Sequence, residues 1–399
     1  MKNLIFIGGL FPKELRKDIE KNSKGVIQNA ADSLQWAIVK GLDHYTTNLQ
    51  IINLPYVGSY PNRYRTFKID SFSFSHNKKS HDWNVGFVNV SLYKMYSRYH
   101  KTKIKLKELL NNDNEIIIIY ALHTPFIKAA VDLKKINPSL KICVIVPDLP
   151  HFMGGSNNVV IRFFKKKEKV FLETLLRQVD AFVLLSDYMH KPLNVANRPW
   201  VRIEGIFNDD LKSNVLQKES FKTILYTGTL SRRYGILNLL DAFSLIKDVN
   251  YRLWICGDGE GSEEINQRCK IDSRIIFFGQ LPREEALKLQ QKATVLVNPR
   301  TSGSEFTKYS FPSKIIEYLA SGTPCIMYRL AGIPKEYFNY CFVPTNETPF
   351  ALYHQILMVC SKSQEELNQL GLKAQRFILE NKTPEKQCLK LYNMLQTYF

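Results

Sequence analysis

The sequence contains several short runs of apolar residues that do not alternate with polar ones. The clearest are 115–120 and 141–146, and a third, 293–297, leads into Asn298-Pro299. Continuous apolar runs of this length are typical of strands in a parallel sheet that is covered on both faces. Segments with apolar residues at helical spacing, such as 26–40, lie between such runs. This alternation predicts an α/β fold with two doubly wound, Rossmann-like domains facing a central cleft.

Length and composition agree with a globular protein of two or three domains. The chain has 399 residues, of which 45% are hydrophobic, and extensive disorder is therefore not expected. The formal net charge of +18 favours polyanionic partners: nucleic acid, anionic lipid headgroups or phosphorylated substrates. The seven cysteines show no CxxC spacing, which indicates buried thiols in a reducing compartment and neither a zinc site nor a disulfide framework.

The apolar runs are too short to cross a membrane. The most continuous one, 116–122, has seven residues, and a bilayer crossing needs about 20. The apolar run at 4–7 is short and charged residues follow it closely, so it is interpreted as a first buried strand and not as a signal peptide. We expect a cytoplasmic protein.

The stretch 298–325 has the chemistry of a phosphate-binding turn. A helix is expected to begin near Pro312-Ser313-Lys314 and to end at Gly322, because Pro favours the first helical turn and Gly the position after the last. Backbone N–H groups at a helix start suit a phosphate, and Lys314 adds a full charge. Glu317 can accept hydrogen bonds from a sugar diol. The alternative is an ordinary loop and helix with a solvated Lys and Glu.

This stretch resembles the donor-site signature of retaining glycosyltransferases of family 4, which have the GT-B fold. The motif Glu317-Tyr318-Leu319-Ala320-Ser321-Gly322-Thr323-Pro324 fits the second half of that signature. Tyr309 stands where the family usually has its first Glu, and Phe311-Pro312 replaces the usual Phe-Gly pair. The resemblance implies that Glu317 binds the donor ribose and that Ser313 and Lys314 bind the diphosphate. It also implies that Tyr309, Ser310 and Phe311 belong to the donor-binding segment.

The resemblance extends to the turns that follow other strands of the second domain. The family often has Arg and Lys in the first of these turns, where this sequence has Thr229 and Tyr234. An Arg fork suits phosphate oxygens, so the adjacent arginines are expected to replace those cations, with Arg233 preferred. The further residues that the resemblance places beside the donor are Gly228, Arg232, Gly257, Gly279 and Leu281.

In the first domain, candidate residues follow two strands. Gly8 and Gly9 end the first strand and are expected on the acceptor side, although a plain tight turn explains them equally well. Asp148 and His151 follow the strand at 141–146, where ligand groups gather in open α/β sheets. The sequence Asp148-Leu149-Pro150 resembles a strand end that lines the reaction centre in family 4, so Asp148 and His151 are the catalytic candidates.

The resemblance implies three segments: an acceptor-binding domain at 1–207, a donor-binding domain at 208–380, and a final helix at 381–399 that packs back on the first domain. The basic amphipathic segment 161–182, supported by the lysines at 94–107, predicts contact with an anionic membrane surface. The alternative is a core helix with a solvated basic face. Asp258-Gly259-Glu260 is not interpreted as a metal site, because a Gly turn after a parallel strand needs no metal.

The resemblance implies a hexosyltransferase that retains anomeric configuration, and the cations at the donor site predict a reaction that uses neither metal nor cofactor. Its donor would be a nucleotide-diphosphate sugar, with UDP as the default base, and its acceptor a saccharide or lipid-linked saccharide of cell-surface polysaccharide synthesis. It would act in the cytoplasm or at the inner face of the membrane. Two alternatives remain: a GT-B nucleotide-sugar 2-epimerase, which needs an acid and base carboxylate pair, and a basic nucleic-acid-binding protein. No nucleic-acid recognition motif supports the second.

Overall fold

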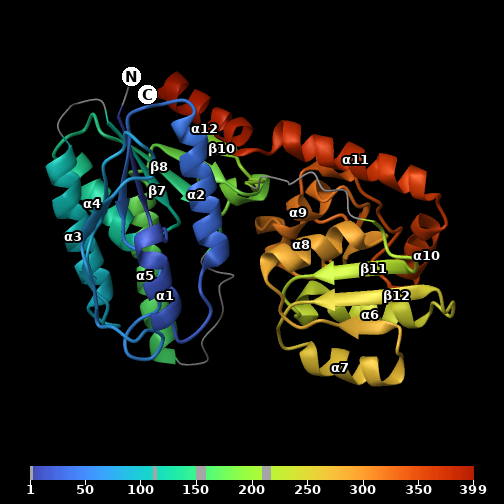
Figure 1. The fold of residues 1–399 in the computed structure, drawn as a ribbon. Helices are drawn as coiled ribbons and strands as arrows, with labels where there is room; N and C mark the ends of the chain where they lie inside the picture. The colour runs from blue at the N-terminus through green and yellow to red at the C-terminus, as the bar shows by residue number, and fades with distance from the viewer. Residues whose placement is uncertain (1–2, 111–114, 150–158, 209–216) are drawn as a thin grey trace. The chain divides into compact units, whose positions relative to one another are not determined.

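The protein consists of two compact α/β units (Figure 1). The computed structural model describes residues 3–110, 115–149, 159–208 and 217–399. Unit 1 comprises Met1–Asn208 and Pro384–Phe399, and unit 2 comprises Asp209–Thr383. The divisions expected from the sequence lie at 207/208 and 380/381.

Unit 1 is built on an eight-stranded sheet. Seven neighbouring strands pair in parallel, and only the last strand pairs in the antiparallel direction. In order across the sheet, the strands are β10 (Trp200–Arg202), β9 (Ala181–Leu184), β8 (Lys141–Val146), β7 (Glu115–Tyr120), β1 (Asn3–Gly8), β2 (Leu49–Asn53), β5 (Asp82–Asn84) and β4 (Phe72–Phe74). The central strands are buried along almost their whole length, as their continuous apolar sequences predict.

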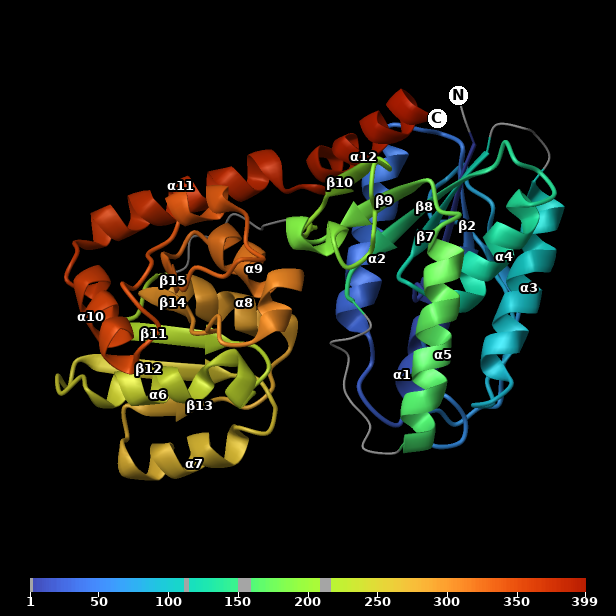
Figure 2. The ribbon, with the colours of Figure 1, turned by 180° about the vertical axis from the view of Figure 1, so that it is seen from behind.

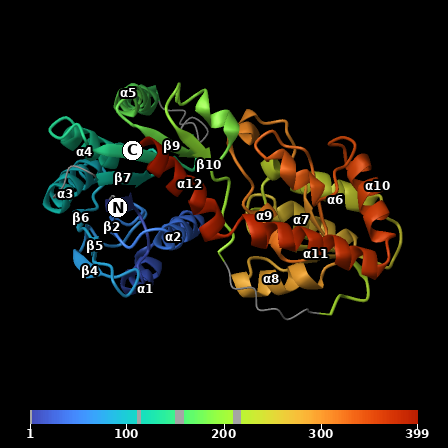
Figure 3. The same cartoon turned by 90° about the horizontal axis from the view of Figure 1, so that it is seen from above.

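Helices cover both faces of this sheet (Figure 3). One face carries α3 (Lys94–Leu109), α4 (Thr124–Lys134) and α5 (Val159–Leu176). The other carries α1 (Lys13–Asn22), α2 (Asn29–Asp43) and α12 (Pro384–Tyr398). The core of the second face joins alternate strand residues such as Phe6 and Ile118 to Ile38 of α2 and Leu391 of α12. The last helix of the chain therefore completes the core of the first unit.

The segment 55–90 is more ordered than its sequence suggests. Its weak periodicity predicts an irregular insertion, but the structure forms four short strands there. Two of them, β3 (Lys68–Ile69) and β6 (Phe87–Val88), make a separate antiparallel ribbon, while β4 and β5 extend the edge of the main sheet. Strands of two or three residues show too few alternations to be recognised in a sequence.

Unit 2 is built on five parallel strands. Figures 1 and 2 show α6 and α7 on one face of this sheet and α8 and α9 on the other. The strands, in order across the sheet, are β13 (Ile275–Phe277), β12 (Tyr251–Cys256), β11 (Lys222–Thr227), β14 (Val295–Asn298) and β15 (Cys325–Met327). The helices are α6 (Ile236–Ser244), α7 (Ser262–Ile271), α8 (Arg283–Lys292), α9 (Lys314–Ala320), α10 (Pro349–Cys360) and α11 (Gln364–Asn381).

The two parallel sheets confirm the predicted α/β class. The strands predicted at 115–120 and 141–146 match β7 and β8. The helix predicted at 161–182 is shorter, because α5 ends at Leu176 and the chain then enters β9. None of the helices in the described part of the chain combines the length and apolar character that a bilayer crossing needs.

Candidate functional site

The carboxyl edge of the unit 2 sheet is formed by closely packed glycine turns. Gly228 follows β11, and its N–H donates to the Cys256 carbonyl at the end of β12 (3.0 Å). Gly257 follows β12, and its N–H donates to the Gly279 carbonyl beyond β13 (2.8 Å). A Cβ added at Gly257 would overlap the Gly228 carbonyl, and Gly257 has a φ of +145°. Only glycine allows the backbones to approach this closely.

The turn after β11 carries the predicted arginines. It continues into a short 3-10 helix, η3 (Arg232–Tyr234), whose Ser231 side chain accepts the Arg233 N–H (3.3 Å). The Arg232 backbone N–H donates to the Glu260 carboxylate (3.2 Å), and both arginine side chains are exposed. Thr229 is also exposed, and its carbonyl accepts the Tyr226 hydroxyl (2.8 Å). These contacts fix the loop backbone while leaving both guanidinium groups at the surface.

A second guanidinium that the sequence analysis missed lies beside Arg233. The Arg233 guanidinium is 3.5 Å from the centre of the Phe306 ring, and that of Arg300 is 4.3 Å from the same centre. Arg300 follows β14, is 7% exposed, and donates to the Ser310 hydroxyl (2.6 Å). The Phe306 ring therefore brings the turns after β11 and β14 together with two cations against it. The sequence signal that could have identified Arg300 is its place directly after the apolar run 293–297 and the pair Asn298-Pro299.

The predicted Lys314 and Glu317 form an ion pair on α9. The Lys314 Nζ lies 2.8 Å from Glu317 Oε2, and the Arg283 guanidinium at the start of α8 lies 3.7 Å from Glu317 Oε1. Burial raises the pKa of the Cys256 thiol to about 12, and the positive charge of Lys314 opposes that rise. Lys314 therefore lies near the end of β12, so the structure brings it to the same edge as the glycine turns.

The remaining predicted donor residues occupy different environments. Ser310 bonds to Arg300 and to the Phe306 carbonyl (3.0 Å). Phe311 is buried against the Tyr337 ring with ring centres 5.2 Å apart, so its side chain belongs to the core of unit 2. Tyr309 ends the 3-10 helix η4 (Glu305–Tyr309) and is half-buried, as is Leu281 beyond β13. Ser313 directly precedes α9 and is exposed.

Tyr318 of the signature fixes α9 to the end of β11. Its buried hydroxyl accepts the Thr227 N–H (2.7 Å) and donates to the Thr227 carbonyl (3.0 Å). The backbone N–H and the backbone carbonyl of Thr227 are thus both bound by the Tyr318 hydroxyl. This contact sets the position of Lys314 and Glu317 on the same helix relative to the Gly228 turn.

In unit 1, the predicted acceptor-side glycines are closely packed by side chains. The Gly9 N–H donates to Gln35 Oε1 of α2 (2.8 Å), and a Cβ added at Gly9 would overlap the Tyr56 ring. A Cβ added at Gly8 would overlap the Gln35 amide. The structure thus gives these two glycines a packing role in the turn after β1.

Aromatic residues surround the carboxyl edge of the unit 1 sheet. The Tyr56 hydroxyl donates to the Tyr120 carbonyl at the end of β7 (2.7 Å). Asp148 is exposed just after β8, and its charge contributes to raising the pKa of Tyr120, after the larger effect of burial. The structure therefore places Asp148 beside the end of β7. His151, the other catalytic candidate, lies outside the described residues.

The turn after β7 contains a histidine that the sequence analysis missed. Ala121 has a φ of +68°, an uncommon conformation for a residue with a Cβ, and His123 precedes α4 two residues later. The His123 Nε2 lies 3.1 Å from Arg98 Nη1, and burial, with the charges of Arg98 and Lys94, lowers the His123 pKa well below 6.5. Its Nδ1 has no hydrogen-bond partner among the described residues. A half-buried, neutral imidazole at a strand end is a second candidate for substrate contact.

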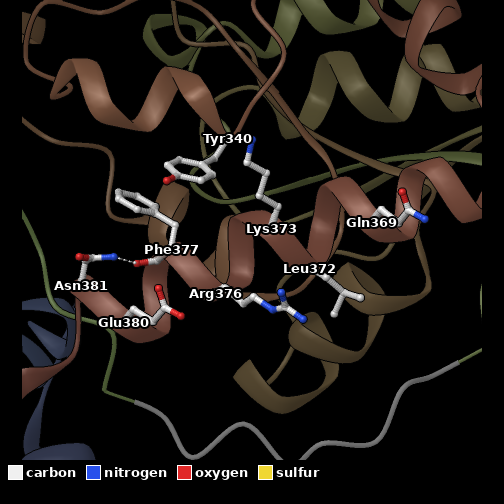
Figure 4. Close-up of a pocket in the computed structure, with 8 residues that line it drawn as sticks. All are labelled: Tyr340, Gln369, Leu372, Lys373, Arg376, Phe377, Glu380 and Asn381. Carbon is white, nitrogen blue, oxygen red and sulfur yellow. Dashed lines mark hydrogen bonds between the residues drawn. The ribbon is translucent and has the colours of Figure 1, made fainter.

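The surface of unit 2 also has a hollow of about 370 Å³, which is not lined by the predicted donor residues (Figure 4). Its lining residues are Tyr340 and, from α11, Gln369, Leu372, Lys373, Arg376, Phe377, Glu380 and Asn381. None of these is a predicted site residue, and Figure 4 shows several of them pointing away from one another on different sides of α11. Across the described ranges, no three His, Cys, Asp or Glu side chains are grouped to hold a metal ion.

Comparison with known sequences places a family domain on unit 2. Residues 221–362 match the model of the family described as glycosyl transferases group 1. N-acetyl-alpha-D-glucosaminyl L-malate synthase from Bacillus anthracis is 26% identical over 129 residues, which cover 31% of this chain and 32% of that protein. The aligned region thus spans about a third of the length of that relative.

Solved structures resemble the whole chain at low sequence identity. Sucrose-phosphate synthase from Thermosynechococcus elongatus has a TM-score of 0.66 and 14% identity, with 99% of each chain covered. The lipopolysaccharide outer core galactosyltransferase WaaB has a TM-score of 0.64 and 14% identity, with both chains fully covered. Anabaena HepE in complex with UDP has a TM-score of 0.63 and 12% identity, also with both chains fully covered. Residues 221–362 are therefore similar to a group 1 glycosyltransferase domain, in a chain that has the GT-B fold.

Proposed function

We propose that this protein is a retaining glycosyltransferase that moves a hexose from a nucleotide-diphosphate donor, UDP-sugar being the default, to a hydroxyl group. The acceptor would be a saccharide or a lipid-linked saccharide of cell-surface polysaccharide synthesis. The observation that carries the proposal is the convergence of Lys314, Glu317 and the Gly228 and Gly257 turns on one sheet edge, inside the family domain. The binding of UDP by HepE, a protein of the same fold, supports the choice of nucleotide.

In this proposal the unit 2 cations stabilise the departing diphosphate. Lys314 is bound to Glu317 in the structure (2.8 Å), and a bound diphosphate would compete for its ammonium group. Glu317 would then be available to accept hydrogen bonds from the ribose hydroxyls, while Arg283 stays beside it. Arg233 is exposed and held against Phe306, so its guanidinium needs little rearrangement to meet a phosphate oxygen. Charge stabilisation by these groups is the reason to propose a reaction that needs no metal.

Retention of configuration would follow a front-face path. The leaving phosphate would accept the proton of the acceptor hydroxyl as the new glycosidic bond forms on the same face of the sugar. Unit 1 would supply the acceptor side through the carboxyl edge that holds Asp148 and the neutral His123. We further propose a cytoplasmic enzyme that associates with the inner face of the membrane.

Nucleotide release tests this function. The full chain is incubated with UDP-glucose, UDP-galactose, UDP-N-acetylglucosamine and GDP-mannose, with and without a divalent metal chelator, and free nucleoside diphosphate is measured. We expect release from one donor, unaffected by the chelator, and a loss of about 10²–10³-fold in Lys314→Ala, typical of removing a charge-stabilising donor. Lys270→Ala is the matched control, because Lys270 lies in the last turn of α7, at the opposite end from the glycine turns.

The same assay separates the alternatives. Conversion of a donor into its 2-epimer without net nucleotide release would identify an epimerase. A salt-sensitive gel shift with no turnover of any donor would favour a nucleic-acid-binding protein. Release that is equal in wild type and Lys314→Ala would contradict the proposed donor site.

A further inference from the structure

Helix α3 is oriented with its polar side toward the protein. Lys94, Ser97, Arg98 and Thr102 are at most 9% exposed, whereas Met95 and Ile104 are 40% and 43% exposed. A surface helix of a soluble protein usually has the opposite arrangement, with an apolar stripe toward the core. The side of α3 that faces away from the sheet therefore carries exposed apolar side chains next to exposed Lys101 and Lys107, while the buried side is mostly polar.

Specific hydrogen bonds hold this orientation. Lys94 Nζ donates to the Val57 carbonyl (2.6 Å), and Arg98 Nη2 donates to the Pro55 carbonyl. The Ser97 hydroxyl accepts the Val88 N–H of β6 (3.0 Å). Rotating the helix to bury its exposed apolar side chains would break all of these hydrogen bonds. The outward position of the apolar side chains is thus built into unit 1.

The outward side chains form a continuous strip, which we call the α3 strip. It consists of Leu92, Tyr93, Met95, Tyr96 and His100. The Tyr93 and Tyr96 ring centres are 5.3 Å apart, and those of Tyr96 and His100 are 6.0 Å apart with the planes nearly parallel. Leu92, in the turn before α3, is 97% exposed, and the two tyrosines are 50% and 54% exposed. Exposed groupings of apolar side chains with polar rims mark interaction sites more often than isolated ones do.

Positive charge surrounds this strip. On the helical layer formed by α3, α4 and α5, the sequence has thirteen Lys or Arg against four Asp or Glu, and two of these cations, Lys94 and Arg98, are buried. Without those two, the three helices on this face of the sheet still have eleven Lys or Arg against four Asp or Glu, a surplus of seven. Lys101 and Lys107 of α3 are themselves exposed.

We propose that the α3 strip docks this protein on an anionic lipid bilayer, with Leu92 and the tyrosines entering the headgroup region and the lysines of the layer facing the acidic lipids. Tyrosine suits this environment, because its ring is apolar while its hydroxyl stays hydrated. The lysines supply the electrostatic attraction that a short apolar strip needs for stable binding. This inference rests on the membrane association proposed above; it concerns a surface of unit 1 and does not depend on which sugar is transferred.

Charge complementarity favours a bilayer over a second copy of the chain. A symmetric dimer through this strip would place two helical layers of the same positive charge against each other, which is unfavourable. An anionic bilayer neutralises the same charges. Among the described helices, α5 extends the basic layer with Val170 and Phe171, which are 55% and 43% exposed, so a flat surface can meet more than one helix.

Vesicle co-sedimentation of the full chain tests the proposal. Vesicles are made of phosphatidylcholine alone or mixed with phosphatidylglycerol, and binding is measured at low salt and at about 1 M salt, where the Debye length falls to about 3 Å. Wild type is compared with the triple variant Leu92→Ser/Tyr93→Ser/Tyr96→Ser and with Lys101→Gln/Lys107→Gln. The matched control, Val249→Ser/Ile271→Ser, removes apolar side chains of unit 2 that are 70% and 83% exposed.

We expect wild type to bind only the anionic vesicles, and high salt to weaken the binding. The triple variant should lose at least tenfold in partition coefficient, the lysine variant about fivefold for each charge removed, and the control nothing. All of these side chains are exposed, so melting temperatures should remain close to that of wild type. Absence of binding to anionic vesicles, or equal binding by wild type and the triple variant, would overturn the proposal. A wild-type dimer in solution that the triple variant abolishes would overturn it in favour of a second copy.

Discussion

A buried histidine in unit 1 allows a quantitative prediction about stability. The His76 side chain is 1% exposed and lies between two carboxylates, with Nδ1 2.6 Å from Asp82 Oδ2 and Nε2 2.9 Å from Asp43 Oδ1. Burial alone would lower the His76 pKa, but the hydrogen bonds to Asp43 and Asp82 and their charges outweigh it and raise the pKa to about 9. The folded protein therefore holds His76 as an imidazolium that joins the β4–β5 hairpin to the end of α2.

The sign of the pH dependence follows from the raised pKa. Below the ordinary histidine pKa of about 6.5, both the folded and unfolded forms bind the proton, and the stabilisation is fully present. As the pH rises through about 9, the folded form also loses the proton and the stabilisation disappears. The pKa of His76 is about 6.5 in the unfolded chain and about 9 in the folded protein. With these two values, the contribution of His76 to the unfolding free energy falls by about 2.5 kcal/mol when the pH rises from 7 to 10.

Urea denaturation at several pH values measures this loss. The unfolding free energy of unit 1 is compared between wild type and His76→Gln, with His44→Gln as the control, since the His44 side chain is 57% exposed. The difference between wild type and His76→Gln should shrink by about 2.5 kcal/mol from pH 7 to pH 10, while His44→Gln should follow wild type. A difference that stays constant with pH, or that grows as the pH rises, would refute the reasoning.

Three further substitutions test the contacts that shape unit 2. Gly257→Ala should destabilise the protein by more than 2 kcal/mol, because the added Cβ overlaps the Gly228 carbonyl. Gly279→Ala is the comparison and should have about half that effect, because its added Cβ meets no other atom. Thermal denaturation measures both effects. Tyr318→Phe should cost about 1–3 kcal/mol, because it leaves the buried N–H and carbonyl of Thr227 without their partner, and wild-type stability would contradict this. Ser363→Ala removes the reciprocal cap of α11 and should cost about 1 kcal/mol in urea denaturation; no change would show that the cap is unimportant.

The sequence predicted the fold well where the chemistry is local. Continuous apolar runs identify β7 and β8, because strands buried on both faces need apolar residues at nearly every position. The orientation of α3 was not predictable in this way. From the sequence alone, Lys94 and Arg98 are expected on a basic surface. Both are buried because they donate hydrogen bonds to the Val57 and Pro55 carbonyls, which are distant in the sequence. Such contacts depend on tertiary structure, which periodicity does not describe.

The candidate site was predictable in part. The turns after β11 and β12 could be located from glycines that follow apolar strands, and the structure packs them against each other. His123 also follows an apolar strand, the same signal that pointed to Asp148, but its burial and its contact with Arg98 appear only in the fold. Phe311 is predicted in the donor-binding segment, and that the Phe311 ring packs against Tyr337 could not be read from the sequence, because this contact depends on tertiary structure.

Isothermal titration calorimetry with UDP, GDP, ADP and CMP tests the central claim most directly, since it asks whether unit 2 holds a nucleotide through Lys314. We expect wild type and Lys270→Ala to bind one nucleoside diphosphate equally well. Lys314→Ala should bind it about 10- to 100-fold more weakly, the usual cost of a lost hydrogen bond to a charged group. No binding of any nucleotide by wild type, or equal affinity in Lys314→Ala, would contradict the assignment of this edge of the sheet as the donor site.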